Sequence, residues 1–579
     1  MRKLAPLALC LSFLSCRDRT PGPRPELNCA AGTDFTQWGG AASHTGTVCA
    51  PAQDLARPIA DLVYDPFVAD ERRDSGGDLL VHYQSPLISG DDFFMAAKEG
   101  NYVPCDDPAK GLPAPCGSAA WNQQTWTERK YSFENGKVVS KWRFQSTWKP
   151  PPDNGHLGGW EPVFHAALGP REVYVPCVGG SVMLVSRETG KVRLSIDPFA
   201  KDPNVYVAGP VTTDAAGNIV YTALRLDPAR PWSGEAHGWV VRATPAGAVQ
   251  TVSLDALLPG APGPADACER SYPVADPKHP PVYPLEDAAG NVLPPPTAPC
   301  GFQRPALNHA PAIAADGTIF VVSRAHRNSR YSYLVALKPD LSLKWAASLR
   351  NLLADGCGVF VPKDEMPGHC HTNAPDGIDP ATGGPPAGLA DDDSTASPVA
   401  LPDGAVLYGA LSFYNGARGH TFKFTAAGKP AGSYDFGWDT TPSFFIHGGT
   451  YSIVLKDNHY DTQGPYFITQ LDANLKPEWK YQSTNTQSCS RAADGTQECV
   501  SDHPGGFEWC VNALAIDGNG IAYANSEDGN LYAIYPGGKE KQRLFLNLAV
   551  GAAYTPLAID GKGRIYTQNA GHLFVVGAP

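Results

Sequence analysis

Short apolar segments alternate with tight polar turns along most of the chain, and one arrangement of them recurs. It consists of a small residue and Pro, an apolar strand, a turn that often reads Asp-Gly, and a second strand containing Tyr or Phe. Proline is tolerated at the first residue of a strand but rarely inside one. The pattern therefore predicts short antiparallel strands joined by tight turns. The clearest copies are Ala310–Phe320 (APAIAADGTIF), Ser397–Tyr408 (SPVALPDGAVLY) and Thr555–Tyr566 (TPLAIDGKGRIY).

Eight copies of this unit can be placed along the sequence. The three shortest spacings between opening positions are 48 (162 to 210), 44 (398 to 442) and 43 (513 to 556) residues. This is the length of a four-stranded propeller blade. We therefore predict an all-β fold: a single eight-bladed β-propeller of four-stranded antiparallel blades over residues 37–579. The opening positions are Pro86, Pro162, Pro210, Pro311, Pro398, Pro442, Ala513 and Pro556.

The ring is expected to close with strands from both ends of this region. The last copy supplies a third strand at Leu573–Val576 and no fourth, whereas Ile59–Tyr64 precedes the first copy. Closing the last blade with this N-terminal strand would remove exposed sheet edges. We expect one closed ring and not several domains.

The composition agrees with this prediction. The 579 residues include 59 Gly and 55 Pro, which favour turns and disfavour helices. Hydrophobic residues make up 42% of the chain, enough for a large core, and this excludes a disordered protein. The net charge is −12 without a basic cluster, which argues against a nucleic-acid surface.

Several segments carry a resemblance to a known family. Gln37–Gly46 (QWGGAASHTG) precedes the first blade, and Ser132–Trp142 (SFENGKVVSKW) ends in a tryptophan. Trp345 and Trp479 close similar stretches, and Leu194 replaces the tryptophan in the second repeat. In these features the chain resembles the pyrroloquinoline-quinone-like (PQQ-like, quinoprotein-like) β-propeller repeat family. The resemblance implies tryptophans packed between neighbouring blades, but the family includes both dehydrogenases and non-enzymatic scaffolds.

The N-terminus has the features of an export signal. Arg2 and Lys3 precede a short apolar run, and Phe13–Cys16 resembles a bacterial lipobox in which Cys16 becomes lipidated. We predict a lipoprotein signal peptide at residues 1–15 and a polar, Pro-rich tether at 16–36. The protein is then an exported lipoprotein of the bacterial cell envelope, anchored in the outer membrane by its lipid. An ordinary signal peptide cleaved nearby, and hence a secreted protein, is the alternative.

Twelve cysteines remain when Cys10 and Cys16 are set aside, and an even number in an exported chain favours disulfides. No Cys-x-x-Cys pair is present, which argues against structural zinc. Each long spacing between repeats holds one local pair, inside an insertion. The insertions fall between second and third strands or between blades, and these connections share one face of a propeller. The local pairs are Cys105/Cys116, Cys268/Cys300, Cys357/Cys370 and Cys489/Cys499.

Four cysteines lie outside these local pairs. Cys29 and Cys49 are expected to pair with each other near the N-terminus. Cys177 and Cys510 are expected on the looped face, and we predict a long-range disulfide between them. An exchange of partners with Cys29 or Cys49, or a reactive thiol, are the alternatives.

Residues just before each inner strand should surround the mouth of the central funnel on the looped face. Aromatic, His, Asp and Asn side chains suit a polar, planar or sugar-like ligand. Each of these residue types is also common in turns, so a purely structural role is one alternative. Another is that the insertions bind no ligand and only fill the funnel. The candidate ligand-binding residues are Trp160, Glu161, Asn308, His309, Asp439, Thr440, Trp509, Asn512 and Tyr554.

Three further polar clusters are candidate ligand or metal sites. Asp391–Asp393 lacks the alternation of a calcium loop, so a solvated acidic turn is expected. His369 and His371 flank Cys370, which a disulfide would remove as a ligand. Asp457, His459 and Tyr460 form another cluster in the sixth repeat. We predict no metal site.

These observations favour a non-catalytic scaffold that binds a protein or a small polar ligand through its looped funnel face. The alternative is a quinoprotein dehydrogenase with PQQ and calcium, or another enzyme that uses His309 or His371 as a base. The chain has no adjacent Cys-Cys pair and no assignable Glu, Asn and Asp calcium set of the kind that the quinoproteins of the family carry. It also lacks the Gly-x-Ser-x-Gly and His-Glu-x-x-His motifs. We predict no cofactor.

Overall fold

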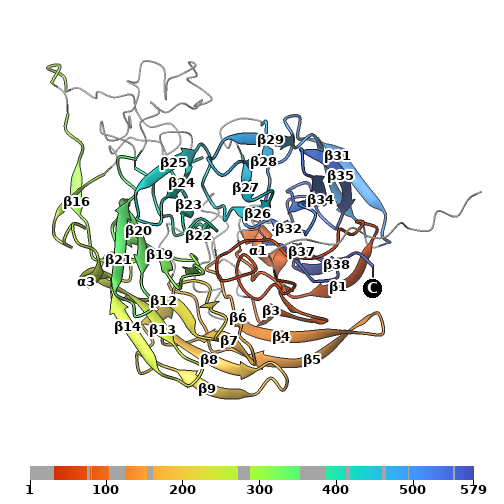
Figure 1. Cartoon of the computed structure of the whole chain (residues 1–579), viewed down its shortest axis with the longest axis horizontal. Coiled ribbons are helices and arrows are strands. Elements are labelled where there is room, and N and C mark those ends of the chain that lie inside the picture. Colours follow the sequence, from red (N-terminus) through yellow and green to blue (C-terminus); the bar gives the residue numbers. More distant parts are fainter. Residues whose placement is uncertain are drawn as a thin grey trace, which may run out of the picture.

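Eight antiparallel sheets surround a central axis in the computed structural model of the protein (Figure 1). Each sheet is a blade of four strand positions, and the predicted eight-bladed propeller is confirmed. The structure describes residues 32–74, 79, 81–102, 124–152, 161–270, 287–291, 293–352, 387–412, 418–458, 464–492, 494–551 and 555–578.

The blades follow one another in sequence order, from the innermost to the outermost strand. Blade 1 contains β2 (Leu87–Ser89), β3 (Asp92–Gly100), β4 (Gln124–Glu134) and β5 (Lys137–Gln145). Blade 2 contains β6 (Ala167–Leu168), β7 (Glu172–Cys177), β8 (Ser181–Ser186) and β9 (Val192–Ile196). Blade 3 contains β10 (Val205–Val207) and β11 (Thr212–Thr213) at the inner position, then β12 (Ile219–Leu226), β13 (Ala236–Ala243) and β14 (Val249–Ser253). Blade 4 contains β17 (Gln303–Pro305) and β18 (Ala312–Ile313), then β19 (Ile319–Ala325), β20 (Asn328–Leu337) and β21 (Leu343–Ser348).

The second half of the ring repeats this order. Blade 5 contains β22 (Val399–Ala400), β23 (Val406–Ala410), β24 (His420–Phe424) and β25 (Pro430–Tyr434). Blade 6 contains β26 (Ser443–His447), β27 (Thr450–Asp457), β28 (Phe467–Leu471) and β29 (Pro477–Gln482). Blade 7 contains β32 (Ala515–Ile516), β33 (Ala522–Asn525), β34 (Asn530–Tyr535) and β35 (Lys539–Phe545). Blade 8 contains β36 (Ala558–Ile559), β37 (Ile565–Asn569), β38 (His572–Val576) and β1 (Pro58–Val63).

The N-terminal strand closes the last blade, as the sequence predicts. β1 pairs antiparallel with β38, with Asp61 opposite Phe574 and Leu62 opposite Leu573. Figure 1 shows this red strand beside the blue C-terminal strands. Residues from the two ends of the propeller therefore share one sheet, blade 8, whose inner strand β36 contacts β2 of blade 1.

One predicted opening position is wrong. Seven of the eight lie within two residues of the inner strand that they open, but Pro162 lies five residues before β6. Pairing begins only where Ala167 meets Tyr174 of β7. Ala166 occupies the slot directly before the strand, so a small residue takes the place of proline there.

Tryptophans of the outer strands pack on the next blade, which confirms the packing that the resemblance implies. Trp142 Nε1 donates to the carbonyl of Arg187 at 2.9 Å. Gly190 lies below the ring at φ +69°, where a Cβ would come within 2.8 Å of Trp142. Glycine is therefore required both for the turn and for the contact. Trp345 packs in the same way on Gly428, and Trp479 on Gly538.

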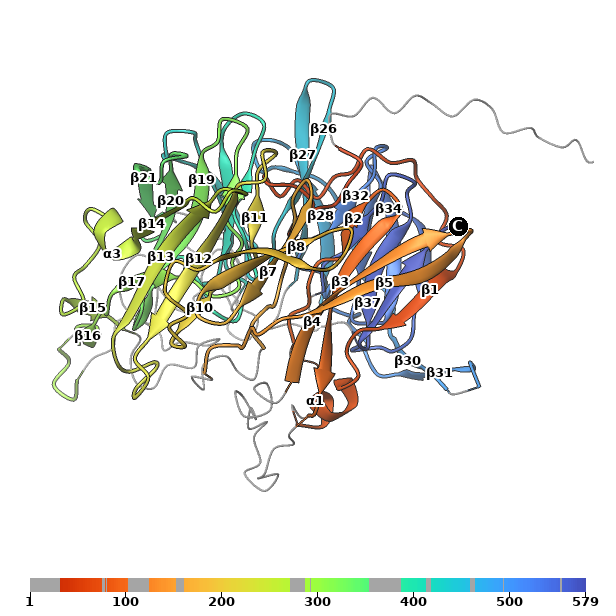
Figure 2. The same ribbon diagram turned by 90° about the horizontal axis from the view of Figure 1, so that it is seen from below.

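The two faces of the propeller differ in their connections. The turns between first and second strands and between third and fourth strands lie on one face, called here the turn face. The other connections lie on the opposite face, called the loop face. The loop face carries helix α1 (Val68–Asp74) and two hairpins, β15–β16 (Ala267–Glu269 and Thr297–Pro299) and β30–β31 (Gln487–Arg491 and Gln497–Ser501), as Figure 2 shows. On the turn face the tip of β26–β27 extends beyond the other blades (Figure 2).

Helices are short in the part of the chain that the structure describes. Besides α1, the four-residue α3 (Leu254–Leu257) packs on blades 3 and 4. None of the helices among these residues is long and apolar enough to cross a membrane.

Candidate functional site

Two residues predicted at the funnel mouth meet through a third that was not predicted. Asn512, ahead of β32, donates from Nδ2 to Thr395 Oγ1 at 2.5 Å. Thr395 in turn donates from its backbone nitrogen (2.6 Å) and its hydroxyl (2.8 Å) to Oδ1 of Asp439, ahead of β26. All three side chains are buried. The segments that precede blades 5, 6 and 7 are thus joined by side-chain hydrogen bonds.

Asn308, between β17 and β18 of blade 4, joins the segments that precede blades 2 and 5. Its Nδ2 donates to the carbonyl of Asp392 at 2.9 Å, and its Oδ1 accepts from the backbone nitrogen of Val163 at 2.8 Å. Asn308 has φ +66°, a left-handed conformation that asparagine adopts more readily than most residues. Both ends of the amide are engaged within the protein.

His309 is buried beside it and is also engaged at both nitrogens. Nδ1 contacts the carbonyl of Leu307, and Nε2 lies 2.9 Å from the hydroxyl of Tyr408. Burial lowers the pKa of His309 to about 4, so the ring is neutral at pH 7. A neutral ring that donates at Nδ1 and accepts at Nε2 satisfies both contacts. This arrangement leaves His309 no nitrogen for a substrate proton.

Glu161 belongs to a cluster of charges around Lys98, called here the lysine cluster. Nζ of Lys98, at the loop-face end of β3, lies 2.6 Å from Glu161, 2.8 Å from Glu71 and 2.9 Å from Asp65. All four side chains are at most 7% exposed. Tyr83 donates at 2.8 Å to the same oxygen of Asp65, Oδ2, that Lys98 contacts. An ammonium group therefore occupies the space that a cation would take among three carboxylates.

The ionisation of the lysine cluster follows from burial and mutual attraction. Burial alone would lower the pKa of Lys98, but Asp65, Glu161 and Glu71 outweigh it and hold that pKa well above its ordinary value. Burial raises the pKa of Glu161 to about 7 despite the attraction of Lys98. Burial and repulsion from Asp65 raise the pKa of Glu71 well above its usual range. Glu161 and Glu71 therefore hold a proton to higher pH than exposed carboxyl groups do, whereas Lys98 keeps its positive charge.

Asp392 lies in the acidic tract for which a solvated turn was predicted, and that prediction is wrong for this residue. Its carboxylate makes a bidentate ion pair with Arg304 and also contacts Arg324 at 3.0 Å. Burial alone would raise the pKa of Asp392, but the two arginines outweigh it and hold the pKa well below its usual range. The tract faces inward because blade 4 supplies two buried guanidinium groups for it.

The remaining predicted mouth residues have other surroundings. The ring of Trp509 is fully buried, with centroids 5.0 Å from Tyr532 and 5.8 Å from Tyr481. Thr440 is also fully buried. Trp160 and Tyr554 lie outside the described residues, as do His369, His371, His459 and Tyr460.

Comparison with known proteins gives structural matches only. No protein-family model matches the chain, and no curated protein matches it. A europium-containing methanol dehydrogenase aligns with 92% of this chain and 89% of its own at 10% identity and a TM-score of 0.44. BamB from Moraxella catarrhalis aligns over 90% and 99% at 9% identity and a TM-score of 0.40. Quinohemoprotein alcohol dehydrogenase from Comamonas testosteroni aligns over 95% and 82% at 12% identity and a TM-score of 0.45. At identities this low, none of these matches assigns an activity to the chain.

The lysine cluster does not fit the calcium and quinone of the alternative hypothesis. Among the described side chains, no group of three or more His, Cys, Asp and Glu is arranged to hold a metal ion. The carboxylates that come closest already contact Nζ of Lys98. The cavity beside Lys98 and Trp126 measures only about 10 Å³, too small for a quinone ring.

Two of the predicted disulfides are confirmed, and one is wrong. Cys268–Cys300 and Cys489–Cys499 are formed. Cys177 and Cys510 are not disulfide-bonded, because they belong to blades 2 and 7, which are not neighbours in the ring. The Cys177 sulfur lies 3.4 Å from Ser146 Oγ, and the Cys510 sulfur lies 3.1 Å from Glu527 Oε1.

The other cysteines are only partly covered by the structure. Cys49 is disulfide-bonded to a residue outside the described ranges. Cys16, Cys29, Cys105, Cys116, Cys357 and Cys370 lie outside the described residues.

Three of the charged residues that the sequence analysis missed share one position in the repeat. Lys98 in β3, Arg324 in β19 and Lys456 in β27 each stand at the loop-face end of the second strand of a blade, after an apolar run. Lys456 Nζ lies 3.7 Å from Oδ2 of Asp439, and burial lowers the pKa of Lys456. A cation at the end of an otherwise apolar second strand is the signal that would have found them.

Proposed function

We propose that the protein is an exported scaffold, held at the bacterial cell envelope through a lipid on Cys16, which binds a protein partner through its loop face. The observation that carries this proposal is the hairpin β30–β31. It stands on the loop face in the connection between blades 6 and 7, and among the described residues β31 pairs with β30 alone.

The outer strand of this hairpin offers a free edge. All five residues of β31 are exposed, and Val500 is 65% exposed. An extended segment of another protein can add to such an edge through main-chain hydrogen bonds. An exposed edge is a liability that proteins usually cover or blunt, so its presence supports a role in binding.

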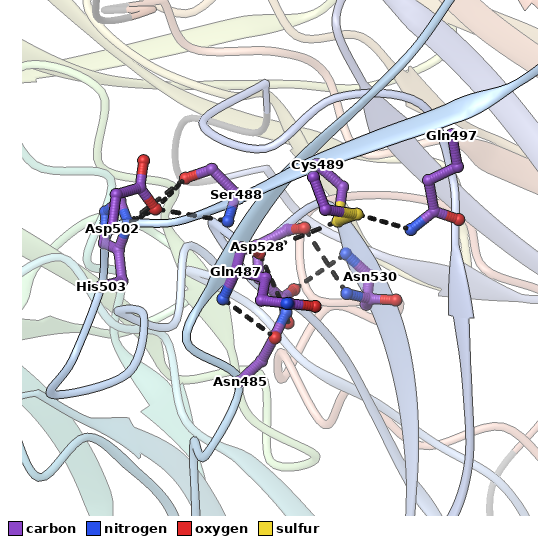
Figure 3. Close-up of a disulfide and its surroundings, with 10 residues drawn as sticks. Asn485, Gln487, Ser488, Cys489, Gln497, Asp502, His503, Asp528 and Asn530 are labelled. Atoms are coloured by element: carbon purple, nitrogen blue, oxygen red, sulfur yellow. Dashed lines mark hydrogen bonds and ion pairs between the residues drawn. A yellow bond between two sulfur atoms is a disulfide. The ribbon is translucent and has the colours of Figure 1, made fainter.

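The hairpin is held in one position before any partner arrives. Cys489 and Cys499 are directly opposite each other across the two strands, and Gln497 donates to the sulfur of Cys499 at 3.4 Å (Figure 3). At its base Asn485 donates to Asp528 of blade 7 at 2.9 Å. A two-stranded hairpin alone is marginally stable in water, so these links supply the order that it needs. Binding to a preorganised edge costs less conformational entropy.

The funnel mouth supports binding over catalysis. Three of the described residues there, Asn308, His309 and Asp392, direct their polar groups at other groups of the protein. These contacts give the loop face a rigid base for a docking surface, and they leave His309, the candidate base, no free nitrogen.

Photo-crosslinking in cells that produce the protein tests the proposal. A benzophenone side chain introduced at Val500 should give one discrete adduct with a second protein. The same group at Val249, which is 38% exposed on the outer strand of blade 3, should give none. Replacing both Cys489 and Cys499 with serine should weaken the adduct while the propeller keeps its melting temperature. Equal labelling from both positions, or none from Val500, would overturn the proposal.

The lipid anchor has its own test. Cys16→Ser should move the protein from the membrane fraction to the soluble fraction, because a lipid and not a helix is proposed to hold it. Unchanged fractionation would contradict the anchor but would leave the binding edge untouched.

A further inference from the structure

A cavity of about 740 Å³ opens on the turn face, opposite the face that the sequence analysis favoured. Its wall comes from the inner ends of blades 3 to 6 and from residues 41–47, which precede the first blade. Most lining side chains are apolar, including Ile313, Leu401 and Phe444. A volume of a few hundred to about 1,000 Å³ with a mostly apolar wall is typical of a site for a small molecule.

The segment before the first blade shapes this cavity by binding the backbones of three blades. The carbonyl of Ala42 accepts from Ile313 of blade 4 at 2.6 Å, and the carbonyl of Ser43 accepts from Ala400 of blade 5 at 3.0 Å. The carbonyl of Thr45 accepts from Phe444 of blade 6 at 2.9 Å. These bonds satisfy the backbone groups around the cavity, so its wall presents mainly side-chain carbon to a ligand.

The cavity also extends outward between blades 3 and 4. Val220 of blade 3 and Ile319 of blade 4 line it, and both belong to the apolar cluster that joins these blades. The outer strand of blade 3, β14, reads VQTVS and carries no tryptophan. The interface between blades 3 and 4 therefore lacks an outer-strand tryptophan. Between blades 1 and 2 such a tryptophan, Trp142, packs on Gly190 and closes the turn-face end.

Of the residues that the structure describes, Arg242 is the one positively charged residue that lines this cavity. It is directly opposite Val220 in the sheet, so it stands on the side of blade 3 that meets blade 4. It is only partly exposed, and within the described part of the chain its guanidinium makes no side-chain hydrogen bond and no ion pair.

The nearby carboxylates are occupied elsewhere. Asp214 accepts from the backbone of Ala216 and Asn218 and from the Asn218 side chain. Asp316, in the neighbouring turn, pairs with Lys344 at 3.1 Å. The positive charge of Arg242 is thus left to the cavity.

We propose that this cavity binds a small molecule with an apolar body and a single carboxylate, and that Arg242 receives the carboxylate. The apolar wall buries the body of the ligand, and the planar guanidinium matches a carboxylate with two parallel hydrogen bonds. An uncharged molecule of the same shape would gain the burial but not the ion pair. The site lies on the opposite face from the β30–β31 hairpin, so it is independent of the proposed partner-binding edge.

Calorimetric titration with dodecanoate tests this site, with dodecan-1-ol as the uncharged match. Dodecanoate should bind at one site per chain, and more tightly than dodecan-1-ol. R242Q should weaken dodecanoate binding about tenfold or more, which is the usual worth of a hydrogen bond to a charged group, and should leave dodecan-1-ol unchanged. R171Q is the matched control, because Arg171 is exposed on the same face in blade 2 and does not line the cavity.

A second variant tests the location without removing charge. Ala315 is exposed in a turn at the cavity wall, so A315W should fill the space without unfolding the protein. It should weaken binding of both dodecanoate and dodecan-1-ol at an unchanged melting temperature. The proposal is overturned if dodecanoate fails to bind saturably, if R242Q and R171Q behave alike, or if A315W binds as the unmodified protein does.

Discussion

Arg304 and Asp392 form a bidentate ion pair inside the propeller, with Nη1–Oδ1 and Nη2–Oδ2 distances of 2.9 and 2.5 Å. Their side chains are only 1% and 7% exposed. Removing one partner of a buried pair leaves an uncompensated charge and typically costs about 3–5 kcal/mol. We expect Asp392→Asn to lower the free energy of unfolding by that amount, because Arg324 also loses its counter-charge. Urea unfolding followed by tryptophan fluorescence measures the change.

An exposed pair provides the control for this prediction. Asp70 and Arg73 are 2.6 Å apart in α1, with side chains 43% and 56% exposed. Exposed pairs contribute about 0–1 kcal/mol, so Asp70→Asn should be nearly neutral. Similar losses in the two variants would show that the burial of Asp392 has no energetic consequence.

The architecture could be predicted because its strands and turns depend on residues that are close together in the sequence. A strand opening at Pro398 and a turn at Asp403-Gly404 constrain the backbone wherever they occur, and eight repetitions leave few alternatives to a closed ring. The last repeat lacks a fourth strand, and Ile59–Tyr64 is a strand left over before the first repeat. Their pairing can therefore be predicted without knowledge of contacts. The same holds for Trp142, whose partner Gly190 ends a short turn in the next repeat.

The polar contacts around the funnel could not be predicted, because the residues that make each contact are distant in the sequence. Arg304 and Asp392 are 88 positions apart, and Asn512 and Thr395 are 117 apart. The sequence of the Asp391–Asp393 tract predicts a solvated turn. The burial of Asp392 depends on the arginines that blade 4 supplies. The predicted disulfide between Cys177 and Cys510 is wrong for the same reason. Both cysteines lie on the loop face, but they belong to blades 2 and 7, which are not neighbours in the ring. Loop length does not predict the turn-face cavity, because short turns and residues 41–47 form it.

Glu128 should make the stability of the protein depend on pH. It is fully buried, and Gln84 donates to one of its oxygens at 3.0 Å. Burial raises the pKa of Glu128 to about 8 from an ordinary value of 4.5. The folded state therefore holds this proton more tightly than the unfolded state, and stability falls as the pH rises from about 4.5 to about 8. Glu128→Gln removes this titration, since the amide stays neutral at every pH.

The melting temperatures of the two proteins at several pH values test this prediction. One pKa unit corresponds to ~1.4 kcal/mol, so Glu128→Gln should be more stable than the unmodified protein by at least about 1 kcal/mol above pH 8. The difference should shrink as the pH is lowered to about 5. Glu188→Gln, in an exposed turn of blade 2, should give the same curve as the unmodified protein. A difference that does not change with pH would contradict the assignment to Glu128.

The packing of Trp142 on Gly190 can be separated from the backbone strain at that glycine. Gly190 and Gly90 have similar φ angles, +69° and +63°, but a Cβ on Gly90 would meet nothing within 4 Å. Gly90→Ala should therefore cost only the left-handed conformation, roughly 1–2 kcal/mol. Gly190→Ala should cost at least about 1 kcal/mol more, because its methyl group would lie 2.8 Å from the Trp142 ring.

A double-mutant cycle checks the cause. In a Trp142→Ala background the methyl group has room, so Gly190→Ala should cost no more than Gly90→Ala does. Free energies of unfolding from denaturant titration supply the four corners of the cycle. An additive result would show that the tryptophan and the glycine do not interact.

Thiol chemistry should distinguish Cys177 and Cys510 from the other cysteines. Both are at most 2% exposed, so a maleimide should not label them in the native protein. After unfolding without reductant it should label both, and peptide mapping should find Cys268–Cys300 and Cys489–Cys499 linked.

The sequence adds Cys105–Cys116 and Cys357–Cys370 to the linked set, because each pair lies within one insertion. Reduction before unfolding should raise the labelled cysteines of the mature chain, Cys16 apart, from two to all twelve. A peptide that links Cys177 to Cys510 would restore the long-range disulfide and contradict the arrangement of blades 2 and 7 described above.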